Sequence, residues 1–217
     1  RHGDYSGRRV IVSAGGTRQP IDPVRFISNR STGKMGHRIA EAARDRGADV
    51  LLVTASDLPH PSGVEVVKAV TVEEMRDAIV PSSSEADLLI MAAAISDFTP
   101  AQVSDQKIKK QGQSGTSLSL VEVEDFMPLA QGRKLVKVAF AAETNNVEEN
   151  AKAKTAPKGA AFVVANDISE PGSGFGTDTN RVTFVDSKGN TQLHPLMTKL
   201  NVGHAILDYA LPLLTKH

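Results

Sequence analysis

The sequence predicts an α/β domain with a Rossmann-like, doubly wound and mostly parallel sheet in three layers, followed by a C-terminal hairpin and helix. Short apolar runs alternate with helix-length amphipathic stretches, which is the pattern of βαβ units. Residues 86–94 are nearly all apolar, as expected of a strand buried on both faces. The chain has 217 residues, 40% of them hydrophobic, which is enough for the core of one such domain.

The expected elements follow in chain order. Strands are predicted at 9–14, 49–55, 64–70, 86–94, 135–142 and 160–167, and helices at 32–47, 71–80, 146–159 and 198–214. A hairpin spans 181–195 and turns at 188–190. Ser31 or Thr32 is expected to cap the first helix and Gly47 to end it, while Thr71 and Glu74 form a capping box.

The domain boundaries follow from composition. Residues 1–8 are polar and contain glycine, which predicts a linker-like lead-in to a longer polypeptide. Residues 9–217 are expected to form a single domain, in which the Lys-rich segment at about 99–117 lacks periodicity and is expected to be a flexible flap.

Charge and cysteine content exclude several classes of function. Lys plus Arg and Asp plus Glu each number 25, so no overall field attracts nucleic acid or a membrane surface. The absence of cysteine excludes disulfides, thiolate zinc sites and thiol nucleophiles. No apolar run is long enough for a signal peptide or a membrane span, and the six histidines form no pair at metal-ligand spacing. A cytoplasmic protein without nucleic-acid or membrane partners is expected.

The segment after the first strand is unusually rich in polar groups. Gly15 and Gly16 permit a close backbone approach to a phosphate, and the following helix offers an N-terminus that favours an anion. A plain tight turn with a helix cap is the alternative, but Arg25 and Asn29 exceed what a cap requires. The dinucleotide fingerprint G-x-G-x-x-G is absent, and the second strand ends in "VTAS" without an acidic residue for a ribose.

Further candidates follow the other strands. Asp97 comes just past the buried strand, where it could accept a hydroxyl or bind magnesium, although a capping role is equally compatible. Lys107 opens "KIKK" in the Lys-rich segment, where a solvated surface is the usual meaning. Lys154 and Lys158 are four residues apart and could meet a polyphosphate together, or lie on a solvated helix face that Pro157 disturbs. All follow carboxyl ends of strands, so one site is expected there.

These motifs together carry a family resemblance. The segments "SAGGTRQPIDPVRFISNRSTGKMG", "AAAISDF", "KIKK", "FAAETNNVEENA" and "VANDI" with "GFGTDTNRVT" resemble the phosphopantothenate-cysteine ligase domain of the bacterial bifunctional coenzyme A biosynthesis protein, from about residue 8 to 214. The resemblance implies that the carboxylate of 4'-phosphopantothenate attacks the α-phosphate of CTP with Mg²⁺ assisting, and that the amine of L-cysteine then displaces CMP. It also implies a homodimer with a shared active site and a fused N-terminal flavin-dependent decarboxylase.

The resemblance assigns residues by position. Asn29 corresponds to an Asn that handles the acyl-cytidylate, Arg25 to a substrate-contacting arginine, and Lys107 to the lysine required to form the acyl-cytidylate. Nucleotide and substrate binding is expected at Gly15, Gly16, Ala93, Ala94, Asp97, Lys107, Asp125, Phe140, Lys154 and Lys158. Magnesium ligands are not identified.

Two other functions remain as alternatives. The first is an NAD(P)-dependent oxidoreductase on the same fold, and the second is a non-catalytic nucleotide-binding module. The segment at 123–126 reads "VEDF" where bacterial members of the family usually carry "NPDI", a segment that helps to seat the cytosine. This departure leaves the choice between CTP and ATP open.

Overall fold

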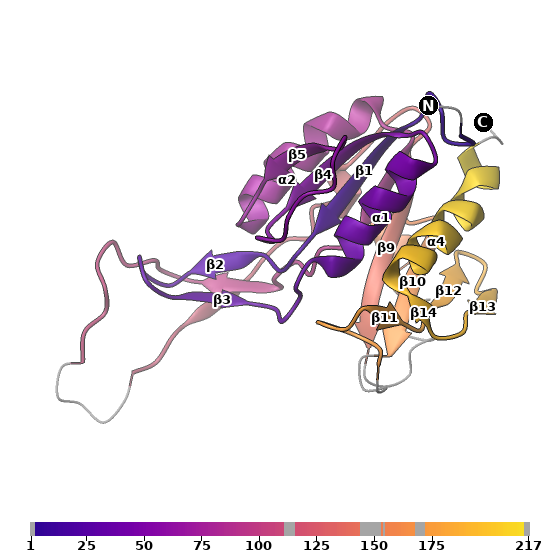
Figure 1. Ribbon diagram of the computed structural model, residues 1–217. Helices are drawn as coiled ribbons and strands as arrows, with labels where there is room; N and C mark the ends of the chain where they lie inside the picture. Colours follow the sequence, from indigo (N-terminus) through magenta and orange to yellow (C-terminus); the bar gives the residue numbers. More distant parts are fainter. Residues whose placement is uncertain (1–2, 111–115, 144–152, 154, 168–171, 215–217) are drawn as a thin grey trace.

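A single eight-stranded sheet organises the protein (Figure 1). The computed structural model describes residues 3–110, 116–143, 153, 155–167 and 172–214. The parallel strands are β1 (Arg9–Ala14), β4 (Asp49–Thr54), β5 (Glu65–Lys68), β6 (Leu88–Met91), β9 (Val136–Glu143) and β10 (Phe162–Asp167). At one edge β12 (Thr183–Asp186) and β13 (Thr191–Leu193) pair antiparallel, and the spatial order is β13-β12-β10-β9-β6-β1-β4-β5. The doubly wound fold and its C-terminal hairpin are confirmed.

Helices cover both faces of the sheet, giving the predicted three layers. Helices α1 (Lys34–Asp45) and α4 (Lys199–Leu214) pack on one face, and α2 (Val72–Ser82) packs on the other. Alternation along β1 serves both cores, because Val10 and Val12 join Ile39 of α1 while Ile11 joins Met75 of α2. The short 3-10 turns η1 (Ser83–Glu85) and η2 (Met127–Leu129) lie in the connections. Outside the main sheet, β11 (Thr179–Asn180) and β14 (Met197–Thr198) form a separate two-stranded ladder.

Helix ends agree with the sequence at two places and differ at one. Thr71 and Glu74 form the expected capping box, and Gly47 follows α1 with a φ of 93°. The cap predicted at Ser31 or Thr32 is wrong, because Gly33 stands at the N-cap with a φ of 85° and no side-chain cap bond. The left-handed backbone brings the helix close to β4, a position that requires glycine.

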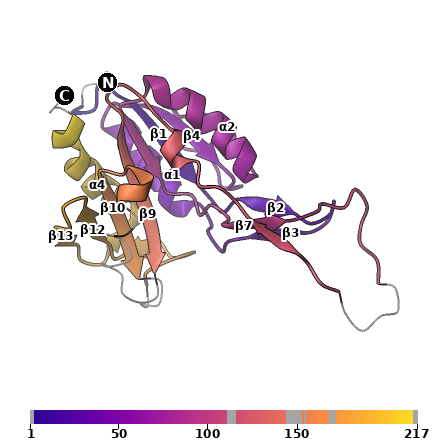
Figure 2. The same ribbon diagram turned by 180° about the vertical axis from the view of Figure 1, so that it is seen from behind.

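An arm that the sequence did not reveal projects from the sheet (Figures 1 and 2). Two antiparallel hairpins build it: β2 (Arg18–Pro20) with β3 (Phe26–Ser28), and β7 (Phe98–Pro100) with β8 (Leu120–Glu122). Backbone hydrogen bonding joins the two hairpins, since Ser104 N donates to the oxygen of Ile21 at 3.0 Å. We call residues 18–28 and the described part of 98–122 the arm. The expected flap lies within it.

Two boundaries differ from the prediction, and a third can be followed only in part. Tyr5 lies inside the predicted linker-like lead-in, yet it is fully buried and its hydroxyl donates to the oxygen of Leu207 at 2.6 Å. Strand β6 ends at Met91 rather than at residue 94, which frees residues 92–94 to line the edge of the sheet. Of the helix predicted at 146–159, the described residues 153 and 155–158 are helical, Gly159 is in a turn, and residues 146–152 and 154 lie outside the described residues.

Candidate functional site

Two loops meet at the carboxyl ends of β1 and β6. Ala94 N donates to the oxygen of Gly15 at 2.8 Å, and Thr17 N donates to the oxygen of Ala94 at 3.2 Å. The side-chain amide of Asn29 donates to the oxygens of Ala94 and Ile95 at 3.3 and 3.1 Å. From β1 the chain winds to β4 on one side and to β6 on the other, so this is the topological switch point where such sheets bind ligands.

Glycines let the loops approach each other closely. Gly15 has a φ of 88°, and a Cβ there would lie 2.7 Å from the backbone nitrogen of Ser56. A Cβ on Gly16 would lie 2.8 Å from the oxygen of Asn29. A Cβ on Gly33 would lie 2.5 Å from the Cβ of Ser56. Gly15 and Gly16 therefore permit the loops to pack closely through their backbones, but neither glycine lines the cavities described below.

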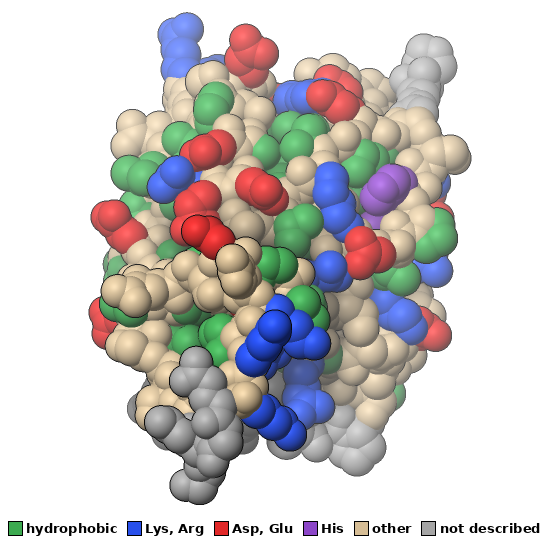
Figure 3. All heavy atoms as spheres, turned by 90° about the vertical axis from the view of Figure 1, so that its left-hand side faces the viewer, with side chains coloured by type: hydrophobic (Ala, Val, Ile, Leu, Met, Phe, Trp, Pro, Cys, Tyr) green, Lys and Arg blue, Asp and Glu red, His purple; other side chains and the backbone are tan. Residues whose placement is uncertain are grey.

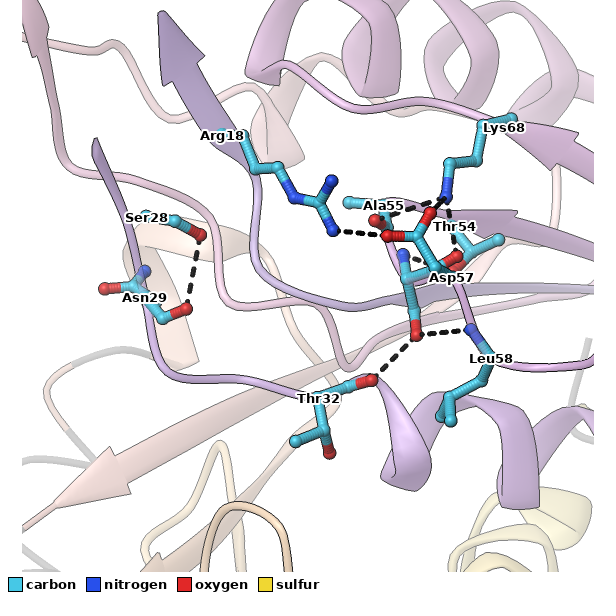
Figure 4. A network of polar contacts seen from close by, with 10 residues as sticks. Arg18, Ser28, Asn29, Thr32, Thr54, Ala55, Asp57, Leu58 and Lys68 are labelled. Atoms are coloured by element: carbon cyan, nitrogen blue, oxygen red, sulfur yellow. Dashed lines mark hydrogen bonds and ion pairs between the residues drawn. The ribbon is translucent and has the colours of Figure 1, made fainter. Parts of the chain in front are cut away.

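A polar network fixes these loops against β4 (Figure 4). The hydroxyl of Ser56 donates to the oxygen of Thr32 at 2.7 Å and accepts from Leu58 N at 3.2 Å. Asp57 pairs with Arg18 at 2.7 Å and also with Lys68. Lys68 and then Arg18 lower the pKa of Asp57 to about 2.

This network bears on the dinucleotide alternative. The second strand ends in "VTAS" without an acidic residue, but Asp57 follows directly, three residues beyond β4. Its carboxylate is taken up by two cationic side chains instead of being free to accept ribose hydroxyls. With the glycine fingerprint also absent, this edge of the sheet does not have the features of a nicotinamide-dinucleotide site.

Most of the expected binding residues converge on one hollow beside the switch point. A cavity of about 370 Å³ is lined by Asn29, Ala93, Ala94, Asp97, Asp125, Phe140 and Lys158, all predicted from the sequence. It adjoins a smaller cavity of about 100 Å³, with which it shares Ala93, Ala94 and Phe140. Lys158 forms an ion pair with Asp125, whose other carboxylate oxygen accepts from Met127 N at 3.0 Å. We call the two cavities together the switch-point pocket.

Two predicted catalytic residues lie on the arm instead. Arg25 donates through Nε to Asp22 at 3.0 Å and through Nη2 to the oxygen of Ile108 at 2.8 Å. The neighbouring Lys107 is exposed, and neither it nor Arg25 lines the switch-point pocket. Lys154 lies outside the described residues.

No protein metal cage is present in the part of the chain that the structure describes. There, no group of three or more histidine and carboxylate side chains could hold a metal ion. The helices in those ranges are also too short or too polar to cross a membrane.

Comparison with known proteins assigns the family. The DNA/pantothenate metabolism flavoprotein C-terminal domain matches residues 5–213. The chain belongs to this family. It is similar to the coenzyme A biosynthesis bifunctional protein CoaBC of Bacillus subtilis (strain 168), with 42% identity over 206 residues, covering 93% of this chain and 50% of that protein. A cysteine/cysteine sulfinic acid decarboxylase from an unknown prokaryotic organism is 39% identical over 213 residues, covering 96% of this chain and 59% of that protein.

Structural comparison gives the same family. The C-terminal domain of a coenzyme A biosynthesis bifunctional protein CoaBC superposes with a TM-score of 0.83 at 33% identity, covering 99% of this chain and 100% of that one. The chain thus corresponds to a whole domain of that protein, while it spans about half the length of the curated relatives it matches.

Two residues that the sequence analysis missed also line the switch-point pocket. Lys199, which is 4% exposed at the start of α4, donates to the oxygens of Gly174 and Thr177 at 2.9 and 2.7 Å. Asn180 accepts from the hydroxyl of Ser173 at 2.6 Å. Both side chains hold the glycine-rich loop 172–178 against the switch-point pocket, which they also line. No local pattern marks Lys199, because its partners lie more than twenty residues earlier in the chain.

Burial gives Lys199 a measurable pH signature. Desolvation, with repulsion from Lys34, lowers its pKa to about 8 from the ordinary 10.5. The unfolded chain therefore binds more protons between pH 8 and 10.5, so the free energy of unfolding should rise with pH across this interval. Lys199→Met should remove that rise and, by deleting two hydrogen bonds, cost about 1–3 kcal/mol at pH 7.

Urea unfolding of the wild type and Lys199→Met at several pH values between 7 and 10.5 measures both effects, and Lys188→Met serves as the control at an exposed turn. Parallel stability curves for the wild type and Lys199→Met would contradict the assigned titration.

Proposed function

We propose that the protein is a phosphopantothenate-cysteine ligase that uses CTP. The carboxylate of 4'-phosphopantothenate attacks the α-phosphate of CTP, giving an acyl-cytidylate and pyrophosphate. The amine of L-cysteine then attacks the acyl carbon, and CMP leaves as the amide forms. The observation that carries the proposal is the convergence, in one pocket at the switch point of this family's fold, of seven residues selected from the sequence for this chemistry.

The composition of the switch-point pocket suits a nucleotide. Ala93 and Ala94 leave room at the strand end for a flat base, and Phe140 offers an apolar surface beside them. Lys158 supplies a positive charge for a phosphate, which would have to displace Asp125 from its ion pair. Such a reaction needs positioning and charge stabilisation rather than a protein nucleophile.

Magnesium is proposed to enter with the nucleotide. Protein sites for Mg²⁺ commonly use one or two carboxylates together with substrate phosphates. Asp97 and Asp125, both at the switch-point pocket, could provide such oxygen ligands. When bound, the ion would neutralise charge on the phosphates.

Pyrophosphate release tests the proposed reaction. The protein is mixed with Mg²⁺ and 4'-phosphopantothenate, with CTP in one arm and ATP in the other, each with and without L-cysteine. Phosphopantothenate-dependent release from CTP, followed by CMP and amide when cysteine is added, is expected. No release from either nucleotide would refute the ligase proposal, and carbon dioxide release from cysteine alone would favour a decarboxylase.

Lys158→Ala should weaken CTP binding about tenfold, because a charge-assisted hydrogen bond to phosphate is lost. Isothermal titration calorimetry with CTP and Mg²⁺ measures the affinity. Lys188→Ala, which removes a positive charge from the β12–β13 turn, should leave it unchanged. An unchanged affinity in Lys158→Ala would place this lysine on a merely solvated surface.

A second copy of the chain is proposed to complete the active site. The arm, to which Lys107 belongs, projects away from the sheet (Figures 1 and 2), and Lys107 does not line the switch-point pocket. Its surface exposes large apolar side chains, including Phe26 at 53%, Phe98 at 48% and Leu120 at 44%. Viewed from the arm's side, Lys and Arg side chains gather near this apolar surface (Figure 3). Pairing two arms would cover the apolar side chains and could bring the lysine of one copy to the pocket of the other.

Light scattering after size exclusion should therefore give twice the chain mass of 23.1 kDa at micromolar protein. Phe98→Ser should shift the protein toward monomer, since it removes apolar area from the arm. Leu193→Ser changes a residue that is 68% exposed on β13, outside the arm, and should leave the mass unchanged. A monomer mass for the wild type would contradict the shared site.

A further inference from the structure

A buried carboxylate joins the two hairpins of the arm. The Asp22 side chain is completely buried although it lies in a turn at the surface, between β2 and β3. Its Oδ1 accepts from Val24 N at 2.8 Å and from Arg25 N at 2.9 Å, which closes the turn. Its Oδ2 accepts from the Arg25 guanidinium and from Ile108 N at 3.1 Å. The Arg25 guanidinium holds the pKa of Asp22 well below its usual range.

The backbone of Ile108 is held through both its N–H and its carbonyl oxygen. While its N–H donates to Asp22, its carbonyl oxygen accepts from Nη2 of Arg25 at 2.8 Å. These contacts span more than eighty residues of sequence and fix the residue next to Lys107. We call Asp22, Arg25 and the backbone N–H and C=O groups of Ile108 the Ile108 clamp.

We propose that Asp22 is a positioning residue for Lys107, acting through the Ile108 clamp to fix the Lys107 segment against the turn at 22–25. The proposal rests on the proposed function for the catalytic importance of Lys107, but the clamp is a structural claim that can be measured without activity. Because Lys107 is exposed and one residue from the clamp, its backbone direction depends on these two hydrogen bonds. Displacing a catalytic group by about 1 Å can cost about 100-fold in rate.

Asp22→Asn separates the turn from the clamp. Asparagine has one acceptor oxygen where the carboxylate has two. If that oxygen keeps the bonds to Val24 N and Arg25 N, the amide NH₂ faces Ile108 N–H and the Arg25 guanidinium, which are also donors. The clamp is therefore expected to open while the turn survives.

Hydrogen exchange and kinetics together provide the test. In Asp22→Asn, the peptide covering 104–110 should exchange roughly tenfold faster, as expected for the loss of a charged hydrogen bond. Pyrophosphate release should fall about 10- to 100-fold. CTP affinity by calorimetry should not change, because Asp22 does not line the switch-point pocket. Asp105→Asn, which removes an exposed carboxylate of the same segment outside the clamp, is the control.

A second pair of variants changes Ile108 instead of Asp22. Ile108→Pro removes the backbone N–H that donates to Asp22, whereas Ile108→Ala keeps this N–H. The proline variant should reproduce Asp22→Asn in exchange and rate, and the alanine variant should resemble the wild type. This pair decides the matter if Asp22→Asn fails to fold.

The outcomes separate the two proposals. Unchanged exchange at 104–110 in Asp22→Asn and Ile108→Pro would overturn the clamp. Faster exchange with an unchanged rate of pyrophosphate release would overturn the positioning role of Asp22. A wild type that releases no pyrophosphate would refute the ligase proposal, and with it the role of Asp22, while the exchange data would still judge the clamp.

Discussion

Lys107→Gln is expected to lower phosphopantothenate-dependent pyrophosphate release by about 10²- to 10³-fold, the usual cost of removing one charge-stabilising donor from a transition state. The first step brings a carboxylate to a triphosphate, so two anions must approach and charge builds at the phosphorus that is attacked. Glutamine keeps a flexible, polar side chain, slightly shorter than lysine, but carries no positive charge. The rate of release under saturating CTP measures the effect.

Lys110→Gln is the matched control for Lys107→Gln, because Lys110 belongs to the same exposed Lys-rich segment. It should change the rate less than threefold, as expected for an exposed charge screened by solvent. CTP affinity should stay unchanged in both variants if Lys107 acts on the transition state rather than on ground-state binding. Full-rate release in Lys107→Gln would remove this lysine from the mechanism.

The sheet could be predicted because its elements are encoded locally. Each parallel strand is an apolar run next to an amphipathic helix, and β6 is apolar throughout because both of its faces are covered. The arm could not be predicted in the same way. Its strands have three residues each, and the two hairpins that bond to each other lie about eighty residues apart in the sequence. Pairing across such distances leaves no periodic signal within either segment.

The residues of the switch-point pocket also divide into those that local sequence predicts and those that it does not. Asn29, Asp97 and Phe140 could be predicted to lie together because they follow strands whose carboxyl ends share one edge of the sheet. Lys199 could not, because a buried lysine at the start of a C-terminal helix has no local signature. The Arg25 guanidinium binds Asp22, three residues earlier in the same turn, and the carbonyl oxygen of Ile108, a contact that only the arm's tertiary pairing creates.

Asn29→Asp is expected to affect the two steps of the reaction differently. Pyrophosphate release should continue, whereas amide formation should fall about 100-fold. The Asn29 amide donates to two carbonyl oxygens at the end of β6, and a carboxylate would instead be repelled by both. The displaced carboxylate would add negative charge to the switch-point pocket, where attack by cysteine on the acyl carbon must build negative charge on the acyl oxygen. The first step is less affected, since its developing charge lies on phosphate oxygens that lysines and magnesium are proposed to offset. Quenched-flow measurement of the acyl-cytidylate and the amide separates the steps. Asn201→Asp, at an exposed position of α4, is the control. Equal loss in both steps would mean that Asn29 acts by holding the loops together rather than on the second transfer.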